Sequence, residues 1–353
     1  MNIRNRYLLK EISKVFALFI VGFYFLYVLI DYSVQTKSFN EANIPAQHII
    51  AYYLCHFSHR AQELICFALL LATIKVLCTL NTSRELVALL AGGISRKKIL
   101  RPFFFVAALC SLFLLWNSQT LLPASLGHLK NIEERYLSDS GSLTPKIQTI
   151  LLPDHSQLIY QNYDSLTKTF FDIYWVRSLD DIYGMRTLDP HLTHPVGASV
   201  DHFTRQKEGD LQLTESWQEK AFTEMKIGPK TLLSAVVPAD EQSITQLWSS
   251  LPSSPPPFSD PAAATITQFN YKLAMPLIPF IIVMAVAPFC MSFDRSKRLF
   301  PIYALGLFGL VTFFTMMNAA GTLGENQIVS PWNTSWAPVL FGLALFSWRY
   351  RKL

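Results

Sequence analysis

The sequence predicts a membrane α-helical protein in which two groups of three transmembrane helices flank an inserted all-β domain. Hydrophobic residues make up 51% of the chain and charged residues only 16%, whereas soluble chains usually carry about 25% charged residues. The apolar residues gather in blocks near both ends of the chain, each close to the roughly 20 residues that cross a bilayer as a helix. The stretch between the two groups instead contains short segments that alternate apolar and polar residues, as β-strands do.

The six predicted spans divide the chain into an N-terminal half, residues 1–123, a β domain, residues 124–262, and a C-terminal half, residues 263–353. The second span contains Glu63 and Lys75. Charges inside a membrane are often functional, but both lie close enough to a membrane surface for their charged groups to reach it, which is the interpretation we favour. The spans are expected at about residues 15–34, 60–80, 99–122, 271–293, 299–323 and 331–348.

Lys and Arg are distributed unequally between the two ends of these spans. Fifteen of them flank one side, whereas the short flanks on the other side hold only Lys37, Arg60 and Lys272. Because cytoplasmic flanks carry the excess of basic residues, we expect both termini and residues 82–101 in the cytoplasm and the β domain on the opposite side. Charges at the outer ends of spans are usually solvated anchors. The alternative is that these three cations contact an anionic headgroup.

The charge of the central region argues against nucleic-acid binding. Residues 124–262 contain 11 Lys and Arg and 18 Asp and Glu, so this region carries −7 and the rest of the chain carries +12. The basic part lies beside the membrane, where anionic lipid attracts it. None of the five cysteines lies in residues 124–262, so no disulfide framework is expected there.

The β pattern is clearest in residues 167–179. Phe171, Ile173 and Trp175 are two positions apart, so they are expected on one face of a strand. Several such segments, separated by turn-forming residues, predict a sandwich, a jelly roll or a barrel-like sheet. The shared face suits either a path for an apolar ligand or a closed β core.

Motifs for metal binding and catalysis are weak or absent. Asp189, His191 and His194 form the segment DPHLTH, whose residue types bind metals, but it is typical of a polar loop and has no further strong ligand nearby. The chain has no G-x-x-x-x-G-K-[ST], G-x-S-x-G or H-E-x-x-H motif. We therefore expect no enzyme, no catalytic residue, no metal site and no cofactor bound by this chain.

Residues 82–101, TSRELVALLAGGISRKKILR, predict a short helix at residues 84–91 between the second and third spans. Thr82 and Glu85 have the spacing of a capping box at its start. The glycine pair that follows can end the helix in the left-handed conformation.

The helix at residues 84–91 is amphipathic, because Leu86, Leu89 and Leu90 fall on one face. Ser95 is then placed to cap the next helix. Two interpretations remain open. The helix rests on lipid, with Glu85 acting only as a cap, or it offers Glu85 and the leucine face to a soluble partner.

The same segment resembles the signature of the LptF/LptG (YjgP/YjgQ) permease family, Ser-x-Glu-Leu-x-Ala-x-x-Ala-x-Gly-x-Ser followed by a proline that opens the third span. The fourth span is similar to the family's in its opening, at Lys272, Leu273 and Pro276, and the order of three spans, a domain and three spans agrees along the chain. The signature is met by Ser83, Glu85, Leu86, Ala88, Ala91, Gly93, Ser95 and Pro102.

The resemblance implies a permease subunit of an ABC transporter that extracts lipopolysaccharide from the inner membrane of Gram-negative bacteria and passes it towards the outer membrane. It implies a periplasmic β-jellyroll-like domain and four kinds of protein partner: a second LptF/LptG-type permease, LptC-like and LptA-like periplasmic proteins, and an LptB-like cytoplasmic ATPase dimer that uses ATP and Mg²⁺. The residues leave open whether the second permease is another copy of this chain.

The resemblance also assigns roles to residues. Glu85 matches the acidic residue of a coupling helix that enters a groove of the ATPase. Lys37, Arg60 and Lys272 would meet the phosphates of the lipid, and the apolar face of residues 167–179 would line its path. Lys272 stands where the family often has Arg, so the charge is kept but the two-pronged hydrogen bonding of a guanidinium is lost. The residues expected to dock the ATPase are Arg84, Glu85, Leu86, Leu89, Leu90, Gly93 and Ser95.

Two other functions fit the residues. One is a permease or mechanotransmitter for a different lipid or lipoprotein. The other is a membrane scaffold whose β domain binds a periplasmic partner without transport. A scaffold needs no docking helix and would not co-purify with an ATPase, so purification of the native membrane complex separates these alternatives.

Overall fold

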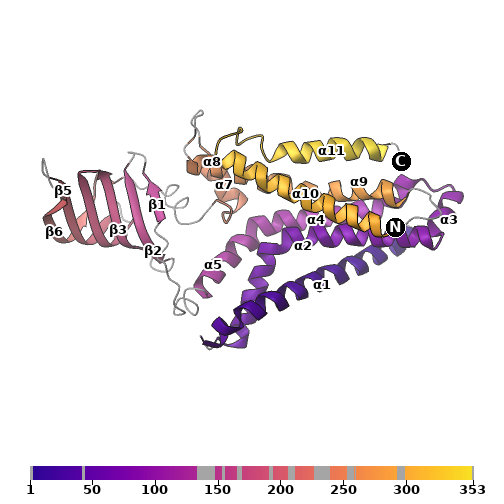
Figure 1. Ribbon diagram of the computed structural model, residues 1–353, viewed down its shortest axis with the longest axis horizontal. Coiled ribbons are helices and arrows are strands. Elements are labelled where there is room, and N and C mark those ends of the chain that lie inside the picture. The colour runs from indigo at the N-terminus through magenta and orange to yellow at the C-terminus, as the bar shows by residue number, and fades with distance from the viewer. Residues whose placement is uncertain are drawn as a thin grey trace. The chain divides into compact units, whose positions relative to one another are not determined.

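The computed structural model separates into a helical unit, Met1–Ser140 with Ala239–Leu353, and a β unit, Gly141–Pro238 (Figure 1). The β unit is shorter than the predicted 124–262 because residues on both sides of it form helices that pack in the helical unit. The structure describes residues 3–41, 44–132, 148–152, 156–164, 169–190, 194–205, 211–225, 239–252, 258, 260–291 and 299–351.

Five helical stretches in the described residues are long and apolar enough to cross a membrane, which confirms a helical membrane protein. The sixth predicted span corresponds to α11 (Trp336–Arg351), whose 16 residues are fewer than the roughly 20 of a full crossing. The five stretches are Ile3–Lys37, Ala46–Thr82, Arg96–Leu126, Ala262–Cys290 and Leu299–Glu325.

The second helix, α2, forms the centre of the helical unit. Its most apolar stretch is 72% buried inside the chain, against 6% for α1, so α2 packs on other helices whereas α1 turns most of its apolar surface outward. Leu69, Ile74 and Leu77 are fully buried there. The helices are α1 (Ile3–Glu41), α2 (Ala46–Thr82), α3 (Glu85–Ala91), α4 (Arg96–Trp116), η1 (Asn117–Leu121), α5 (Leu122–Ile132), α7 (Ile244–Ser250), α8 (Asp260–Ala274), η3 (Met275–Leu277), α9 (Ile278–Cys290), α10 (Leu299–Glu325) and α11.

Two spans depart from regular α-helix. Pro276 has no N–H for an intrahelical hydrogen bond, and α8 passes through the single 3₁₀ turn η3 before α9 begins. Ser111 of α4 donates a hydrogen bond to the carbonyl oxygen of Pro276, which gives the backbone at this break a partner. At the far end of α4, the chain widens into the π-helical turn η1, a feature that often marks functional sites.

The β unit contains a six-stranded antiparallel sheet in the order β1-β2-β3-β4-β5-β6, which confirms the inserted β domain. The described strands follow one another as a meander, without the crossover connections of a jelly roll. Each hairpin therefore pairs neighbours in the chain, as in the register Ile173↔Met185. The strands are β1 (Gln148–Leu151), β2 (Gln157–Asp164), β3 (Thr169–Ser178), β4 (Asp181–Asp189), β5 (Val196–Arg205) and β6 (Leu211–Ala221).

Strand β3 breaks the expected alternation of faces. Phe170, Ile173 and Trp175 are buried in one hydrophobic cluster, whereas Phe171 is only half-buried and lies outside it. Asp172 between them has a φ of 51°, and this left-handed conformation interrupts the strict alternation of an extended strand. The prediction that Phe171 shares a face with Ile173 and Trp175 is therefore wrong.

Candidate functional site

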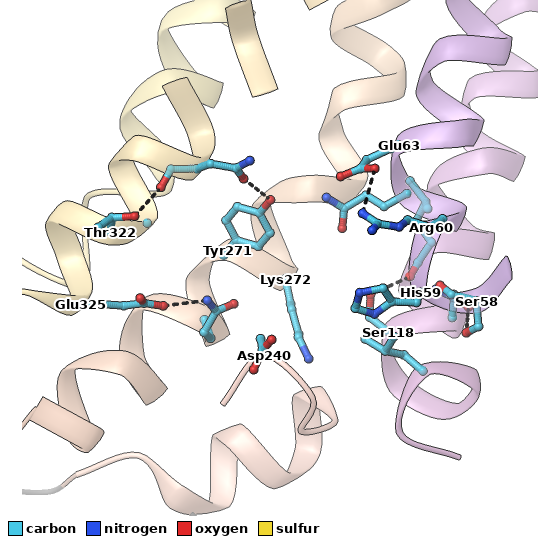
Figure 2. Close-up of a pocket in the computed structure, with 17 residues that line it drawn as sticks. Ser58, His59, Arg60, Glu63, Ser118, Asp240, Tyr271, Lys272, Thr322 and Glu325 are labelled. Atoms are coloured by element: carbon cyan, nitrogen blue, oxygen red, sulfur yellow. Dashed lines mark hydrogen bonds and ion pairs between the residues drawn. The ribbon is translucent and has the colours of Figure 1, made fainter. Parts of the chain in front are cut away.

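A pocket of about 420 Å³ lies in the helical unit (Figure 2). Elements that border it, such as α5 and α8, lie at the end of this unit opposite α3 (Figure 1). The pocket wall combines α2, the junction of α4 and α5, α8, α10 and the segment just before α7. Most of its lining side chains are polar, although the helices that carry them are apolar. They are Ser58, His59, Arg60, Gln62, Glu63, Leu114, Asn117, Ser118, Leu122, Asp240, Gln268, Tyr271, Lys272, Asn318, Gly321, Thr322 and Glu325.

Polar stripes on the membrane helices build this wall. On α10, Asn318, Gly321, Thr322 and Glu325 are three or four positions apart, so they share one helical face. Such stripes are costly inside a membrane and usually face a water-filled, functional cavity. The same spacing brings Gln268, Tyr271 and Lys272 to the pocket from α8.

Hydrogen bonds join the α8 and α10 stripes across the pocket. Gln268 Nε2 donates to Glu325 Oε1 at 2.8 Å, and Tyr271 Oη donates to Asn318 Oδ1 at 3.2 Å. The two helices approach closely at Gly324 of α10, where a Cβ would lie 2.8 Å from Oγ1 and 3.0 Å from Cγ2 of Thr267 on α8. This close contact fixes the wall from which the polar side chains project.

Lys272 is the most buried charged group of the pocket. Its side chain is 6% exposed, and its ammonium donates a hydrogen bond to the carbonyl oxygen of Gln242. Figure 2 shows Asp240 beside the same ammonium. The lysine therefore holds the segment that leads into α7, rather than standing free at the surface as a solvated anchor would.

Arg60 lies at the rim of the same pocket, half-exposed, with its guanidinium 3.7 Å from the Glu63 carboxylate. Lys37 is exposed on α1, a helix that contributes no described side chain to the pocket lining. The structure thus brings two of the three predicted headgroup cations together and leaves Lys37 apart.

The charges of the pocket are mixed. Two cations, Arg60 and Lys272, face three carboxylates, Glu63, Asp240 and Glu325. A bare anion would meet repulsion from the carboxylates. A phosphorylated sugar fits better, because its phosphate can pair with the cations while its hydroxyls bond to the carboxylates, amides and hydroxyls of the wall.

Sequence reasoning missed most of this wall. Asp240, Gln268, Asn318 and Glu325 were not predicted as site residues. The usable signal is the polar stripe in the fifth span, where Asn318, Thr322 and Glu325 recur with helical spacing in an otherwise apolar segment.

The predicted docking helix is α3, but its start differs from the expected capping box. Helix α2 continues through Thr82, whose hydroxyl donates to the carbonyl oxygen of Cys78 at 2.8 Å. Arg84 then turns the chain with a φ of 60° and precedes α3 without a side-chain cap. Gly93 ends the turn at a φ of 77°, as predicted, whereas Ser95 precedes α4 without a capping hydrogen bond from its side chain.

The leucine face of α3 points into the protein. Leu86 is buried, so it is not accessible to a soluble partner, whereas Leu89 and Leu90 are only partly buried against the core of the helical unit. Docking through Leu89 and Leu90 stays a prediction. Glu85 is exposed and accepts hydrogen bonds from Ser83 Oγ at 3.2 Å and from Tyr7 Oη at 3.4 Å. The exposed candidates for docking are Arg84, Glu85, Gly93 and Ser95.

Two of the residues predicted to line a lipid path are core residues of the β unit. Ile173 and Trp175 are at most 1% exposed, and the indole N–H of Trp175 donates to Ser156 Oγ at 2.9 Å.

His191 lies outside the described residues, and the described part of the chain contains no cluster of three or more possible metal ligands.

A comparison with known protein families matches residues 6–352 to the lipopolysaccharide export system permease LptF/LptG. The chain belongs to the LptF/LptG family. The match includes both helical halves and the β unit, so the resemblance to the LptF/LptG family is confirmed over essentially the whole chain. Among curated proteins, none matches the chain.

Proposed function

We propose that this chain is a permease subunit of an ABC transporter that extracts lipopolysaccharide from the inner membrane and delivers it towards the outer membrane. The family match over residues 6–352 carries the proposal. Such a permease needs membrane helices to hold the lipid and a β domain to receive it. The five long apolar helices and the β unit are these parts.

Energy would enter this transporter through α3. The chain has no phosphate-binding loop, so a separate cytoplasmic ATPase dimer of the LptB kind would bind ATP and Mg²⁺. The exposed Glu85 is the group offered to it, and the buried Leu86 ties α3 to the spans. Movement of α3 would therefore be transmitted to the helices. A second permease of the same family and LptC-like and LptA-like periplasmic proteins would complete the complex.

The polar pocket would receive the headgroup of the lipid. Arg60 and Lys272 supply positive charge and the stripes of α8 and α10 supply hydrogen-bonding groups, which suits a phosphorylated sugar. This assignment places the pocket at the periplasmic end of the helical unit, with α3 and both termini at the cytoplasmic end.

The docking role is tested by Glu85→Ala in the complex purified from its native membrane. We expect the variant to insert normally but to lose lipid-stimulated ATP hydrolysis by at least about tenfold, because a charge-assisted contact of roughly 1.5–3 kcal/mol is removed.

Tyr7→Phe is the matched control. It removes one hydrogen-bond donor to Glu85 but leaves the carboxylate in place, so ATPase activity should stay near that of the unmodified protein. Full lipid-stimulated activity in the Glu85→Ala complex would refute docking through this residue.

A further inference from the structure

Residues 239–250, between the β unit and α8, lie beside the pocket in the helical unit. We define the strap as residues 239–250, which include α7 and directly follow the last residue of the β unit, Pro238. Its helix has a complete capping box, in which Ser243 and Gln246 bond to each other's backbone N–H groups. The helix of the strap is therefore locally rigid. Whether the strap stays in place depends on its contacts with the rest of the helical unit.

Contacts from both halves of the chain hold the strap. From η1, Gln119 Nε2 donates to Thr245 Oγ1 at 2.7 Å, and its Oε1 accepts from the Thr245 backbone N–H at 3.3 Å. From α8, Phe269 contacts the ring of Trp248 at 5.5 Å between centroids. Leu247 of the strap itself is fully buried.

A further contact of the strap differs from these because it involves the pocket. Lys272 donates to the Gln242 carbonyl oxygen, and both Lys272 and the nearby Asp240 line the cavity. An ammonium has three N–H donors, so it can meet a ligand in the cavity. A phosphate oxygen is a stronger acceptor for it than a neutral carbonyl, and the same phosphate would repel the Asp240 carboxylate.

We propose that Lys272 is a phosphate-operated latch on the strap. In the empty pocket the ammonium holds the Gln242 carbonyl oxygen beside Asp240 and keeps the strap down. A phosphate group entering the pocket takes the ammonium for itself and pushes Asp240 away, so the strap is released. The inference rests on the proposed headgroup function of the pocket. It adds that a headgroup bound in the pocket releases the strap, the segment that follows the β unit in the chain.

Leu247→Cys provides the readout, because this position is buried while the strap is down. The full chain, with the subunits that co-purify, is placed in phosphatidylethanolamine vesicles and labelled with a membrane-impermeant maleimide. Ser249→Cys is the exposed reference position, and the unmodified chain gives the background of its five native cysteines. We expect lipopolysaccharide to raise the labelling rate at position 247 roughly tenfold, and phosphatase-treated lipopolysaccharide to leave it unchanged.

Inorganic phosphate separates the two possible sources of the group. A rise in labelling with either lipopolysaccharide or inorganic phosphate supports the latch, and the arm that responds identifies whether a lipid headgroup or free phosphate operates it. If vesicles containing the chain bind more lipopolysaccharide than protein-free vesicles but neither arm changes labelling, the latch is refuted and the headgroup site survives.

Lys272→Met tests the latch without any ligand. Loss of a hydrogen bond from a charged donor should raise ligand-free labelling at position 247 roughly tenfold, with no further rise when lipopolysaccharide is added. Unchanged ligand-free labelling in this variant refutes the latch. Failure of the unmodified chain to bind lipopolysaccharide is a separate outcome, and it refutes the headgroup site.

Two matched variants exclude a merely structural effect. Thr245→Val removes the hydroxyl that pairs with Gln119, so it loosens the strap but should keep the response to lipopolysaccharide. Lys75→Met removes an exposed lysine of α2 that does not line the pocket, and should change neither rate nor response. Loss of the lipopolysaccharide response in Thr245→Val would contradict the role given to Lys272.

Discussion

Substitution of Gly324 by alanine tests whether the close approach of α10 to α8 builds the pocket wall. A Cβ at this position would lie 2.6 Å from Thr334 Oγ1, 2.8 Å from Thr267 Oγ1 and 3.0 Å from Thr267 Cγ2. Thr267 and Thr334 are both buried, at 0% and 4% exposure. Thr267 belongs to α8 and Thr334 to the segment before α11. Threonine has few side-chain conformations, so α10 would have to move away from both.

The size of the effect follows from comparison with Gly321, one turn earlier on α10. An added Cβ at Gly321 meets nothing within 4 Å because it projects into the pocket. Replacing glycine by alanine within a helix gains up to about 1 kcal/mol at either position, whereas overpacking costs about 1–3 kcal/mol. We therefore expect Gly324→Ala to be less stable than Gly321→Ala by about 1–3 kcal/mol.

Thermal unfolding of the purified full chain in detergent measures this difference. At roughly 2–4 °C per kcal/mol, the midpoint of Gly324→Ala should lie about 2–12 °C below that of Gly321→Ala. Equal midpoints for the two variants would refute the tight packing of α10 on α8, and with it the geometry that joins Gln268 to Glu325.

Two further predictions concern the pocket and the β unit. Gly321→Leu should fill the pocket and lower lipid-stimulated ATP hydrolysis by at least about tenfold. Gly309→Leu, also on α10 but outside the pocket, should leave this activity unchanged. Equal activities of the two variants would show that the pocket is not used. Trp175→Phe removes the hydrogen bond to Ser156 and leaves a cavity, so protease cleavage of the β unit should become faster by an amount matching about 1–3 kcal/mol. Tyr174→Phe on the exposed face should change the cleavage rate little, and similar rates for both variants would place Trp175 outside the core.

The sequence by itself determined the membrane class, the inserted β domain and the family, because each depends on local patterns. A bilayer requires continuous apolar runs, and these can be read directly from residues such as 299–323. The docking segment could be located for the same reason. Its details could not: the hydroxyl of Thr82 bonds within α2 instead of capping α3, and Leu86 packs on the protein's own core.

Only the tertiary structure decided which residues form the pocket. Lys272 and Gln242 are 30 positions apart, and Arg60 joins them from the other half of the chain. No local pattern records such a meeting, because it depends on how the spans pack. Helix packing likewise left Lys37 outside, although its charge and predicted depth match those of Arg60. In β3, the left-handed Asp172 placed Phe170 in the core in place of Phe171, a choice of backbone conformation that the alternation of residue types does not reveal.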